Sequence, residues 1–224
     1  MFIFGKGLNT YMKILAVGAH LDDIELACGG TLAKAVDHDH QVKMIILSES
    51  GYTNYDGQIM RTSQTAVEEG RKAAQILGVT DIEILDFDSK DIPYHYNVIE
   101  ILDEKIQAYG PDIIFTHWVF DTHQSHEGVA KSTITAARRH NNIYMYEPIY
   151  PAGRSYVAFR PQMYIDIGGY EEQKLEALKM HKTEYKKFGK QWIEGTKARS
   201  SYRGYEMGRE YAEAFEIVRC ELQI

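Results

Sequence analysis

Short apolar segments alternate with helix-like segments along most of this chain. Residues 13–18 and 42–48 are short, almost entirely apolar, and give way abruptly to polar residues, which is typical of buried strands in a parallel sheet. Further strands are expected at 82–87, 112–116, 143–146 and 162–167, and helices at 26–36, 61–77, 97–109, 126–139, 171–187 and 205–219. Strands that alternate with helices predict an α/β fold with a mostly parallel sheet covered by helices on both faces.

Length and composition limit the fold and the function classes. The 224 residues contain no repeat or linker-like segment, and they predict a single domain, residues 1–224, with a sizeable core. The net charge of -7 argues against binding to nucleic acid or anionic membranes, and no apolar run reaches the roughly 20 residues of a membrane span. Residues 1–6 lack the basic start and apolar stretch of a signal peptide. With only two cysteines, Cys28 and Cys220, the chain is expected to be cytoplasmic.

The first polar cluster directly follows the strand predicted at 13–18. His20, Asp22 and Asp23 place an imidazole and two carboxylates within four residues, and both groups are ligands of zinc and other divalent transition metals. The spacing of His20 and Asp23 lets one turn bring both side chains to one point, while Asp22 points elsewhere and could act as a general base. The competing interpretation is that the aspartates only cap the next helix, where carboxylates accept backbone N–H groups.

The second polar cluster, residues 117–126, follows the strand predicted at 112–116. It contains three histidines and an aspartate, namely His117, Asp121, His123 and His126. A catalytic zinc site usually has three protein ligands and an open position for water. One histidine here would complete a His/Asp/His set, and another could donate a hydrogen bond to an oxyanion. For any one histidine alone a solvated loop residue is the commoner interpretation, but two such clusters at strand ends favour a shared metal site.

At these residues the chain resembles the LmbE-like or PIG-L family of metal-dependent de-N-acetylases. The family motif Ala-His-Pro-Asp-Asp is matched by residues 19–23, its glycine pair by residues 29–30, and its His-x-x-His motif by residues 123–126. The glycine pair is expected to permit close helix packing. Residues 121–122 resemble the branch whose motif reads Asp-Thr-His-Gln-Asp-His. The resemblance extends through most of the chain and implies a Rossmann-like three-layer α/β domain.

The resemblance also implies a role for each residue. His20, Asp23 and His126 match the metal ligands, Asp22 the general base, and His123 the histidine that stabilises the oxyanion or acts on the leaving amine. The implied activity is zinc-dependent removal of an acetyl group from an N-acetylated sugar, a GlcNAc-type conjugate, by metal-activated water. His/Asp/His ligation also admits Fe²⁺, Co²⁺ or Mn²⁺. The expected partner is a small-molecule N-acetylated sugar conjugate, and family habit allows a homo-oligomer.

Two positions depart from the family motifs. Leu21 replaces the usual proline, which removes a rigid turn constraint but no chemistry. Ser125 replaces an aspartate expected to orient or charge-balance His123. We therefore expect lowered activity or a substitute carboxylate, for which Asp121 is nearest in sequence. Arg154, which follows a Pro-Ala-Gly segment, is a further candidate for contact with the substrate.

Two other functions are compatible with the sequence. The same centre could hydrolyse a different amide, such as a thiol-sugar conjugate or an N-acylated antibiotic. Alternatively, catalysis has decayed and the chain is a metal- or sugar-binding module, for which Ser125 is the main argument. The intact Asp22 argues against decay, because a pure binding module needs no base beside a metal.

Overall fold

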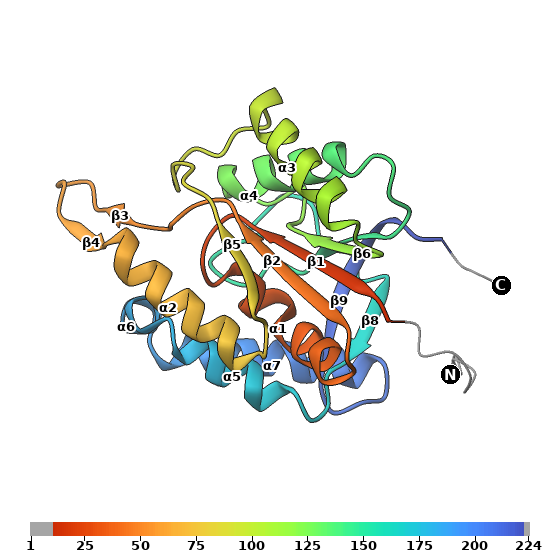
Figure 1. The fold of residues 1–224 in the computed structure, drawn as a ribbon. Coiled ribbons are helices and arrows are strands. Elements are labelled where there is room, and N and C mark those ends of the chain that lie inside the picture. The colour runs from red at the N-terminus through yellow and green to blue at the C-terminus, as the bar shows by residue number, and fades with distance from the viewer. Residues whose placement is uncertain (1–10, 222–224) are drawn as a thin grey trace.

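A seven-stranded sheet in the order β5-β2-β1-β6-β7-β9-β8 forms the centre of the molecule (Figure 1). The computed structural model describes residues 11–221, and the expectation about residues 1–6 lies outside this range. The strands of the sheet are β1 Lys13–Gly18, β2 Gln41–Ile46, β5 Asp81–Ile84, β6 Ile113–Thr116, β7 Ile143–Tyr146, β8 Met163–Asp166 and β9 Ala212–Arg219. Neighbouring strands pair in parallel except at β9, which runs antiparallel to both β7 and β8. The predicted mostly parallel sheet is confirmed.

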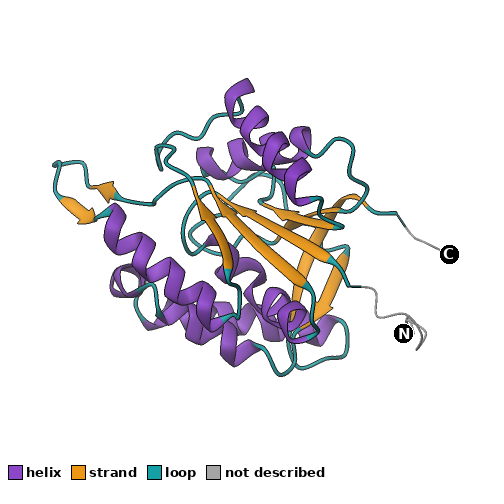
Figure 2. Ribbon diagram, viewed as in Figure 1, coloured by secondary structure: helices purple, strands orange, loops and turns teal. Residues whose placement is uncertain are grey.

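Helices on both sides of the sheet and one small hairpin complete the described part of the chain (Figure 2). The hairpin consists of β3 Tyr52–Thr53 and β4 Ile59–Arg61. The helices are α1 Asp23–Asp37, α2 Ser63–Ile76, α3 Tyr96–Tyr109, α4 Gln124–Ala136, α5 Glu171–Lys179, α6 Lys182–Phe188 and α7 Lys190–Glu206. Helices α3 and α4 lie on one side of the sheet and the others on the opposite side, which gives the three predicted layers (Figure 1). Within residues 11–221, none of these helices combines the length and apolar composition of a membrane span.

Strand β1 shows why the central strands are apolar on both faces. Ile14 and Ala16 belong to the core that packs against α1 and α2, whereas Leu15 and Val17 belong to the core that packs against α3 and α4. Successive side chains of a strand point to opposite faces. A strand covered on both sides is therefore apolar at nearly every position, which explains the continuous apolar run at 13–18.

The order of the strands creates a switch point beside β1. From β1 the chain continues to β2 and β5 on one side, then returns to place β6 and β7 on the other side. In open α/β sheets ligands bind at such a point, outside the carboxyl ends of the strands. The two polar clusters of the sequence follow β1 and β6, the two strands that flank this switch point.

The prediction of a helix at 205–219 is wrong. Helix α7 ends near the start of this segment, and most of it forms β9, which lies between β7 and β8. Alanine and glutamate favour helices, but pairing with two strands satisfies the backbone of β9. The buried Glu213 also accepts a hydrogen bond from Nζ of Lys174 at 2.7 Å, so long-range contacts override the local preference.

The single helix predicted at 171–187 is split into α5 and α6. His181 between them has φ -76° and ψ 65°, which is not helical. Its side chain is fully buried, with Nε2 3.2 Å from Oε1 of Glu25 on α1. The chain thus leaves the regular helical path at the residue that makes this buried contact with a distant helix.

Candidate metal centre and active site

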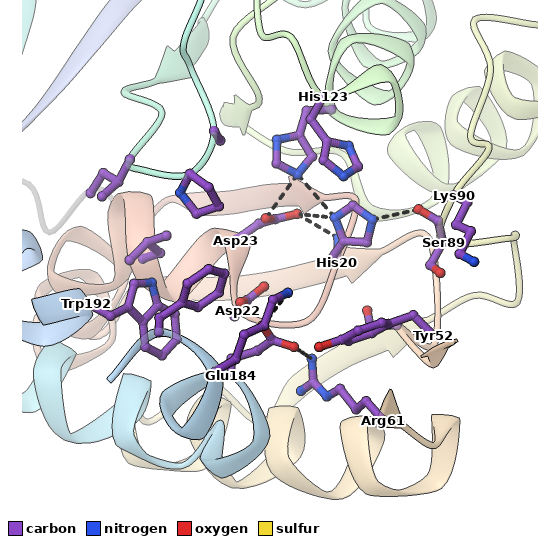
Figure 3. A pocket seen from close by; sticks show the side chains of 18 of the residues that line it. His20, Asp22, Asp23, Tyr52, Arg61, Ser89, Lys90, His123, Glu184 and Trp192 are labelled. Atoms are coloured by element: carbon purple, nitrogen blue, oxygen red, sulfur yellow. Dashed lines mark hydrogen bonds and ion pairs between the residues drawn. The ribbon is translucent and has the colours of Figure 1, made fainter. Parts of the chain in front are cut away.

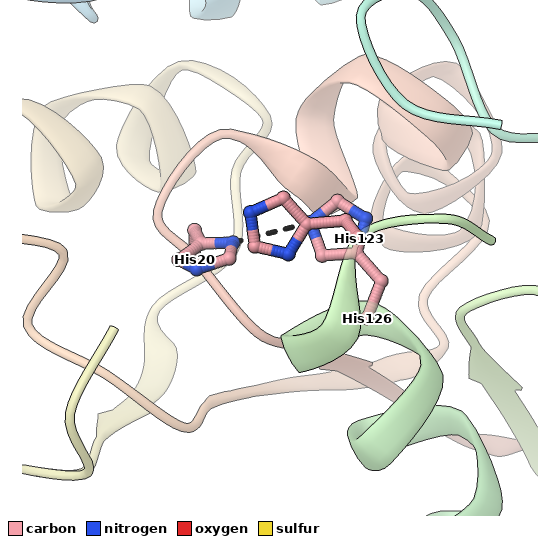
Figure 4. A group of neighbouring side chains, drawn as sticks. All are labelled: His20, His123 and His126. Atoms are coloured by element: carbon pink, nitrogen blue, oxygen red, sulfur yellow. Dashed lines mark hydrogen bonds between the residues drawn. The ribbon is translucent and has the colours of Figure 1, made fainter. Parts of the chain in front are cut away.

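The structure brings His20, Asp23 and His126 together at the switch point (Figures 3 and 4). His20 lies in the loop after β1, Asp23 begins α1, and His126 lies in the first turn of α4. Nδ1 of His20 is 3.2 Å from Nε2 of His126 and 3.3 Å from Oδ2 of Asp23. Oδ1 of Asp23 is 3.3 Å from Nε2 of His126. These three side chains are termed the ligand set.

Hydrogen bonds on the far sides of the two imidazoles determine which nitrogens carry protons. Nε2 of His20 lies 2.8 Å from the carbonyl oxygen of Ser89, which can only accept, so this nitrogen carries the proton. Nδ1 of His126 lies 2.9 Å from Oδ2 of Asp121, whose carboxylate also accepts. In the neutral rings, the nitrogens that face each other therefore bear lone pairs. Together with the Asp23 oxygens they form a group of acceptors that a cation can complete.

The spacing and the charge of the ligand set fit a divalent metal. Tetrahedral zinc with zinc–nitrogen distances of about 2.0–2.1 Å separates its ligand atoms by about 3.3 Å, and the set shows 3.2 to 3.3 Å. Burial disfavours a charged His126, yet the carboxylates of Asp23 and Asp121 raise its pKa to about 10. Burial also acts to raise the pKa of Asp23, but the neighbouring histidines hold it well below its usual range. The surroundings therefore favour positive charge at this point.

Asp22 immediately precedes α1, yet its side chain makes no capping hydrogen bond. Its φ of 129° lies in a region that residues other than glycine rarely adopt, and strain of this kind clusters at active sites. The carboxylate lines the cavity beside Asp23. Burial, followed by repulsion from Asp23, raises the pKa of Asp22 to about 7. The capping interpretation is therefore wrong for Asp22, and its environment suits a general base.

His123 stacks on the ligand set. Its ring centre lies 4.3 Å from that of His126, and its ring meets the edge of His20 (Figure 4). One donor atom of His123 lies within 4.8 Å of those of His20 and His126, so these three histidines form a second grouping able to hold a metal. Nδ1 of His123 is buried and has no hydrogen-bond partner among the described residues. Burial, together with the charges of His126 and His20, lowers the pKa of His123 to about 4, so the ring is neutral at neutral pH.

His117 approaches the same point but already uses its nearest nitrogen. The backbone N–H of Ala19 donates to Nε2 of His117 at 2.9 Å. His117, Asp23 and His126 offer metal-ligating atoms within reach of one another, but this hydrogen bond occupies the lone pair on the nitrogen that lies nearest to Asp23. Burial and the charge of His126 lower the pKa of His117 to about 4. The neutral ring stacks on His126 at 4.1 Å and supports it.

Asp121 contacts His126 and His123 in different ways. Its Oδ2 contacts Nδ1 of His126, while its Oδ1 accepts the backbone N–H groups of His123 and Gly153, each at 3.0 Å. Burial acts to raise the pKa of Asp121, but these hydrogen bonds lower it to about 2. The carboxylate of Asp121 therefore hydrogen-bonds the His126 imidazole and only the backbone of His123, while its charge acts to raise the pKa of the His123 ring.

The two departures from the family motifs both form hydrogen bonds. The backbone N–H of Leu21 donates to Oγ of Ser50 at 2.8 Å, a bond that proline cannot make because it has no N–H. Oγ of Ser125 donates to the carbonyl oxygen of Ser89 at 3.0 Å. Both Leu21 and Ser125 are fully buried. Each departure therefore takes part in a local hydrogen bond of this chain.

A cavity of about 450 Å³ opens in front of the ligand set. Five residues predicted for the site line it: His20, Asp22, Asp23, His123 and His126. Trp192 and Tyr52 lie on opposite sides of the opening (Figure 3). The volume is in the range of small-molecule sites. The structure thus brings the catalytic and ligand candidates into one accessible pocket.

Arg154, predicted to contact the substrate, does not line this cavity. Its guanidinium lies 6.0 Å from the ring centre of Tyr150. The nearby loop residues Pro151 and Ala152 do line the cavity. Two residues of this loop therefore line the cavity, whereas Arg154 does not.

The arginine that lines the cavity is Arg61 at the end of β4. It is buried, and its guanidinium lies 3.2 Å from Glu69 and 3.6 Å from Glu184. Sequence reasoning missed this residue, because the pattern places it at the start of a predicted helix. No local signal marks it, since its two carboxylate partners come from α2 and α6, the second of which is distant in sequence.

Solved structures share the fold of this chain. Protein TT1542 from Thermus thermophilus has a TM-score of 0.81 at 22% identity, covering 95% of this chain and 97% of that chain. A 4-carboxy-2-hydroxymuconate hydratase from Pseudomonas putida KT2440 has a TM-score of 0.78 at 18% identity, covering 95% and 98%. Because these proteins include a hydratase, the shared fold alone does not define the reaction.

Relatives identified by sequence are more informative about the reaction, because they are named as deacetylases. The diacetylchitobiose deacetylase of Thermococcus kodakarensis is 25% identical over 232 residues, covering 97% of this chain and 87% of the relative. The uncharacterized deacetylase YaiS of Escherichia coli is 32% identical over 182 residues, covering 78% and 93%. A family model described as "PIG-L: GlcNAc-PI de-N-acetylase" matches residues 15–137, a segment that includes every residue of the ligand set. The chain therefore belongs to the PIG-L family of de-N-acetylases.

Proposed function

We propose that this protein removes the acetyl group from an N-acetylated sugar, with a zinc ion held by His20, Asp23 and His126. Family membership supplies the reaction class. The observation that carries the finer proposal is that Asp22, free of any capping bond, stands beside three converging acceptors. A carboxylate base next to a cation site is what metal-assisted hydrolysis requires.

The donor set agrees with zinc in chemistry as well as in spacing. Two imidazole nitrogens and a carboxylate oxygen form a common catalytic zinc set, and Fe²⁺, Co²⁺ and Mn²⁺ also accept these ligands. The metal would polarise the amide carbonyl and lower the pKa of water towards neutrality. Metal analysis of the purified protein identifies the ion.

The side chains of the pocket account for the proton movements. Asp22 accepts a proton from the attacking water, whose oxygen bonds to the acetamide carbon. Neutral His123 donates its N–H to the developing oxyanion. The C–N bond then breaks as Asp22 returns the proton to the departing nitrogen. The products are a sugar with a free amine and acetic acid, which keeps the second proton of the water until it ionises to acetate.

The cavity has two chemically different ends (Figure 3). The apolar end is formed by Leu26, Ile149, Phe188 and Trp192. The polar end is formed by Tyr52, Arg61, Ser89 and Lys90. The acetyl methyl group suits the apolar end, whereas the hydroxyl groups of a sugar suit the polar end, where Tyr52 also offers a ring for stacking.

A groove of about 470 Å³ continues the polar end of the cavity. Both share the lining residues Tyr52, Arg61, Ser89 and Lys90, and the groove adds Thr53, Thr62, Ser63 and Asp88. Nζ of Lys90 donates to the carbonyl oxygen and to Oγ1 of Thr53, at 3.4 and 3.5 Å, so one of its three protons is left for a substrate. The opposite charges of Lys90 and Asp88 balance. The groove therefore suits an uncharged polar unit, such as a second sugar, joined to the first.

Acetate release from a substrate panel tests this function. The panel contains N-acetylglucosamine, its N-acetylated disaccharide and analogues with longer N-acyl chains, each assayed with chelator and after the return of zinc. We expect metal-dependent release of acetate, faster from the disaccharide. Preference for a longer acyl chain would indicate a different amidase. No product from any compound, with protein that contains stoichiometric metal, would contradict the proposal and favour catalytic decay.

A further inference from the structure

Ser125 reaches the ligand set through the carbonyl group of Ser89. Its side chain is fully buried in the first turn of α4, and its Oγ donates to the Ser89 oxygen at 3.0 Å. The same oxygen lies 2.8 Å from Nε2 of His20. A backbone carbonyl oxygen has two lone pairs, so Ser125 and His20 together saturate this acceptor.

The start of α4 fixes the turn that carries Ser89. Gln124 donates from Nε2 to the carbonyl oxygen of Lys90 at 2.6 Å, and Ser125 donates to the preceding carbonyl, that of Ser89. Consecutive residues of the helix therefore hold consecutive carbonyls of the turn. The next residue of α4 is His126, a member of the ligand set. One helix end thus carries one metal ligand and positions the acceptor that orients another.

We propose that Ser125 is a positioning residue for the metal ligand His20, acting through the Ser89 carbonyl. This proposal rests on the proposed metal centre. The Ser89 oxygen keeps the proton of His20 on Nε2, which leaves the lone pair of Nδ1 directed at Asp23 and His126. Removal of a partner that orients a metal-bound histidine typically lowers metal affinity or activity by about 10- to 100-fold.

The role requires a hydrogen-bond donor at position 125. An ionised aspartate only accepts, so Ser125→Asp would place a carboxylate against the Ser89 oxygen in a fully buried position. Burial of a charge without a donor is strongly unfavourable. Serine at this position is therefore suited to the hydrogen bonds of this chain and is no sign of decayed catalysis.

Metal affinity of the variants tests the proposal. It is measured by zinc competition with a chelator and by the visible spectrum of cobalt-loaded protein. We expect Ser125→Ala to weaken zinc binding about tenfold and to alter the cobalt spectrum, while Ser125→Thr, which keeps the hydroxyl group, retains most of the affinity. Ser132→Ala is the matched control. Ser132 is also fully buried in α4, but its Oγ has no partner among the described residues, so neither readout should change.

Ser125→Asp separates this role from support of His123. We expect weaker zinc binding than in Ser125→Ala. The proposal is overturned if Ser125→Ala binds zinc as tightly as the wild type. It is equally overturned if Ser125→Asp gains turnover at unchanged zinc affinity, since the new carboxylate would then serve the unpaired Nδ1 of His123.

Separate control measurements address the folding of the variants and the proposed function. Circular dichroism of the metal-free variants checks the fold, and Ser125→Cys, a similar-sized but weaker donor, replaces Ser125→Ala if the alanine variant is unfolded. It is expected to show an intermediate loss of zinc affinity. Because no substrate is present, failure of the deacetylase assay leaves this test valid. A wild-type protein that binds no metal would instead refute the metal centre itself.

Discussion

Two buried clusters of charge in this molecule differ in how their acceptors are satisfied. Between α1, α5 and β9, the carboxylate of Glu213 accepts from Nζ of Lys174 at 2.7 Å and from the backbone N–H groups of Gly30 and Thr31 at 3.0 and 2.7 Å. In the ligand set, lone pairs face one another across 3.2 to 3.3 Å. The Glu213 cluster is complete within the chain and holds elements together. In the ligand set, the proposed metal would take the place of such donors and complete the group of acceptors.

The first family motif contributes to both clusters. Its histidine and aspartates enter the site, while its glycine pair lies in the core near the Glu213 cluster. A Cβ atom at Gly30 would lie 2.8 Å from Cδ1 of Ile167, so glycine is required for the close approach of α1 to the segment after β8. The expected role in close packing is confirmed for Gly30, whereas a Cβ atom at Gly29 would meet its nearest neighbour at 3.4 Å, an ordinary contact. A single motif thus specifies a reactive centre and the packing that supports it.

The largest effect is expected beside the ligand set, from Asp22→Asn. This change removes the base but none of the three ligands, so we expect kcat to fall by on the order of 10³-fold with zinc content unchanged. Asp23→Asn is the contrasting variant, because it removes a ligand and should lose metal as well as activity. Kinetics and metal analysis of the two proteins measure the difference. Loss of metal in Asp22→Asn would contradict the division of roles.

In the Glu213 cluster, Lys174→Met should cost stability and leave the chemistry intact. Removal of one partner of a buried ion pair costs about 3–5 kcal/mol, and Lys174 and Glu213 are both nearly inaccessible. Urea unfolding measures the loss, and kcat/KM per folded molecule should not change. Lys179→Met on the same helix is the control, since Lys179 is 40% exposed and pairs with Glu176 at the surface. Equal losses of stability in both variants would show that the buried ion pair stabilises the fold no more than the surface pair does.

The same contrast explains how much of the site was predictable from sequence. His20, Asp22, Asp23, His123 and His126 were found because each carries its chemistry in its side chain and follows a recognisable strand. Ser89 was not found, because it acts on the ligand set through its backbone carbonyl, which every residue possesses. Residue type carries no signal for such a role, and only the fold reveals it.

Prediction of the fold failed where long-range contacts outweighed local preference. The central strands were predicted because burial on both faces makes them apolar throughout. Strand β9 was missed because its glutamates suggest a helix, and their partners are distant in sequence. Glu213 pairs with Lys174, and Oε1 of Glu216 accepts the backbone N–H of Arg160. The identity of these partners cannot be inferred from the local sequence.

Glu171 is an unsatisfied member of the core beside Glu213. Neither of its carboxylate oxygens has a hydrogen-bond partner among the described residues, and burial raises its pKa from 4.5 to about 7. The folded protein therefore binds a proton on the Glu171 carboxyl group more tightly than the unfolded chain does. The stability that depends on this proton is fully present below about pH 4.5 and is lost as the pH rises towards about 7.

Glu171→Gln should remove this pH dependence. We expect the free energy of unfolding to rise by about 1–3 kcal/mol at pH 8, with little change at pH 4. Urea unfolding across this range measures the difference between variant and wild type. Glu172→Gln is the neighbouring control, because the Glu172 side chain is 70% exposed and should show no such difference. A Glu171→Gln protein with the wild-type pH profile would show that the carboxyl group has the same pKa in both states.

The smallest effect concerns the groove that extends from the ligand set. Lys90→Ala removes one free donor of the groove, and loss of one hydrogen bond changes binding by about fivefold. We therefore expect KM to rise about fivefold for the N-acetylated disaccharide and to stay constant for N-acetylglucosamine. Zinc affinity should not change, because Gln124 contacts the backbone carbonyl of Lys90 and not its side chain.

The outcome of Lys90→Ala distinguishes an extended site from a single-sugar pocket. An equal rise in KM for both substrates would place Lys90 against the first sugar, and no rise for either would refute the groove as a subsite. Lys131→Ala, at an exposed position of α4 whose side chain pairs with Glu127, controls for loss of a positive charge. A selective effect on the disaccharide, with zinc affinity unchanged, would show that the turn at Ser89 and Lys90 serves two sites with different groups. One backbone carbonyl would then orient the proposed metal ligand, and the adjacent side chain would select the unit attached to the sugar.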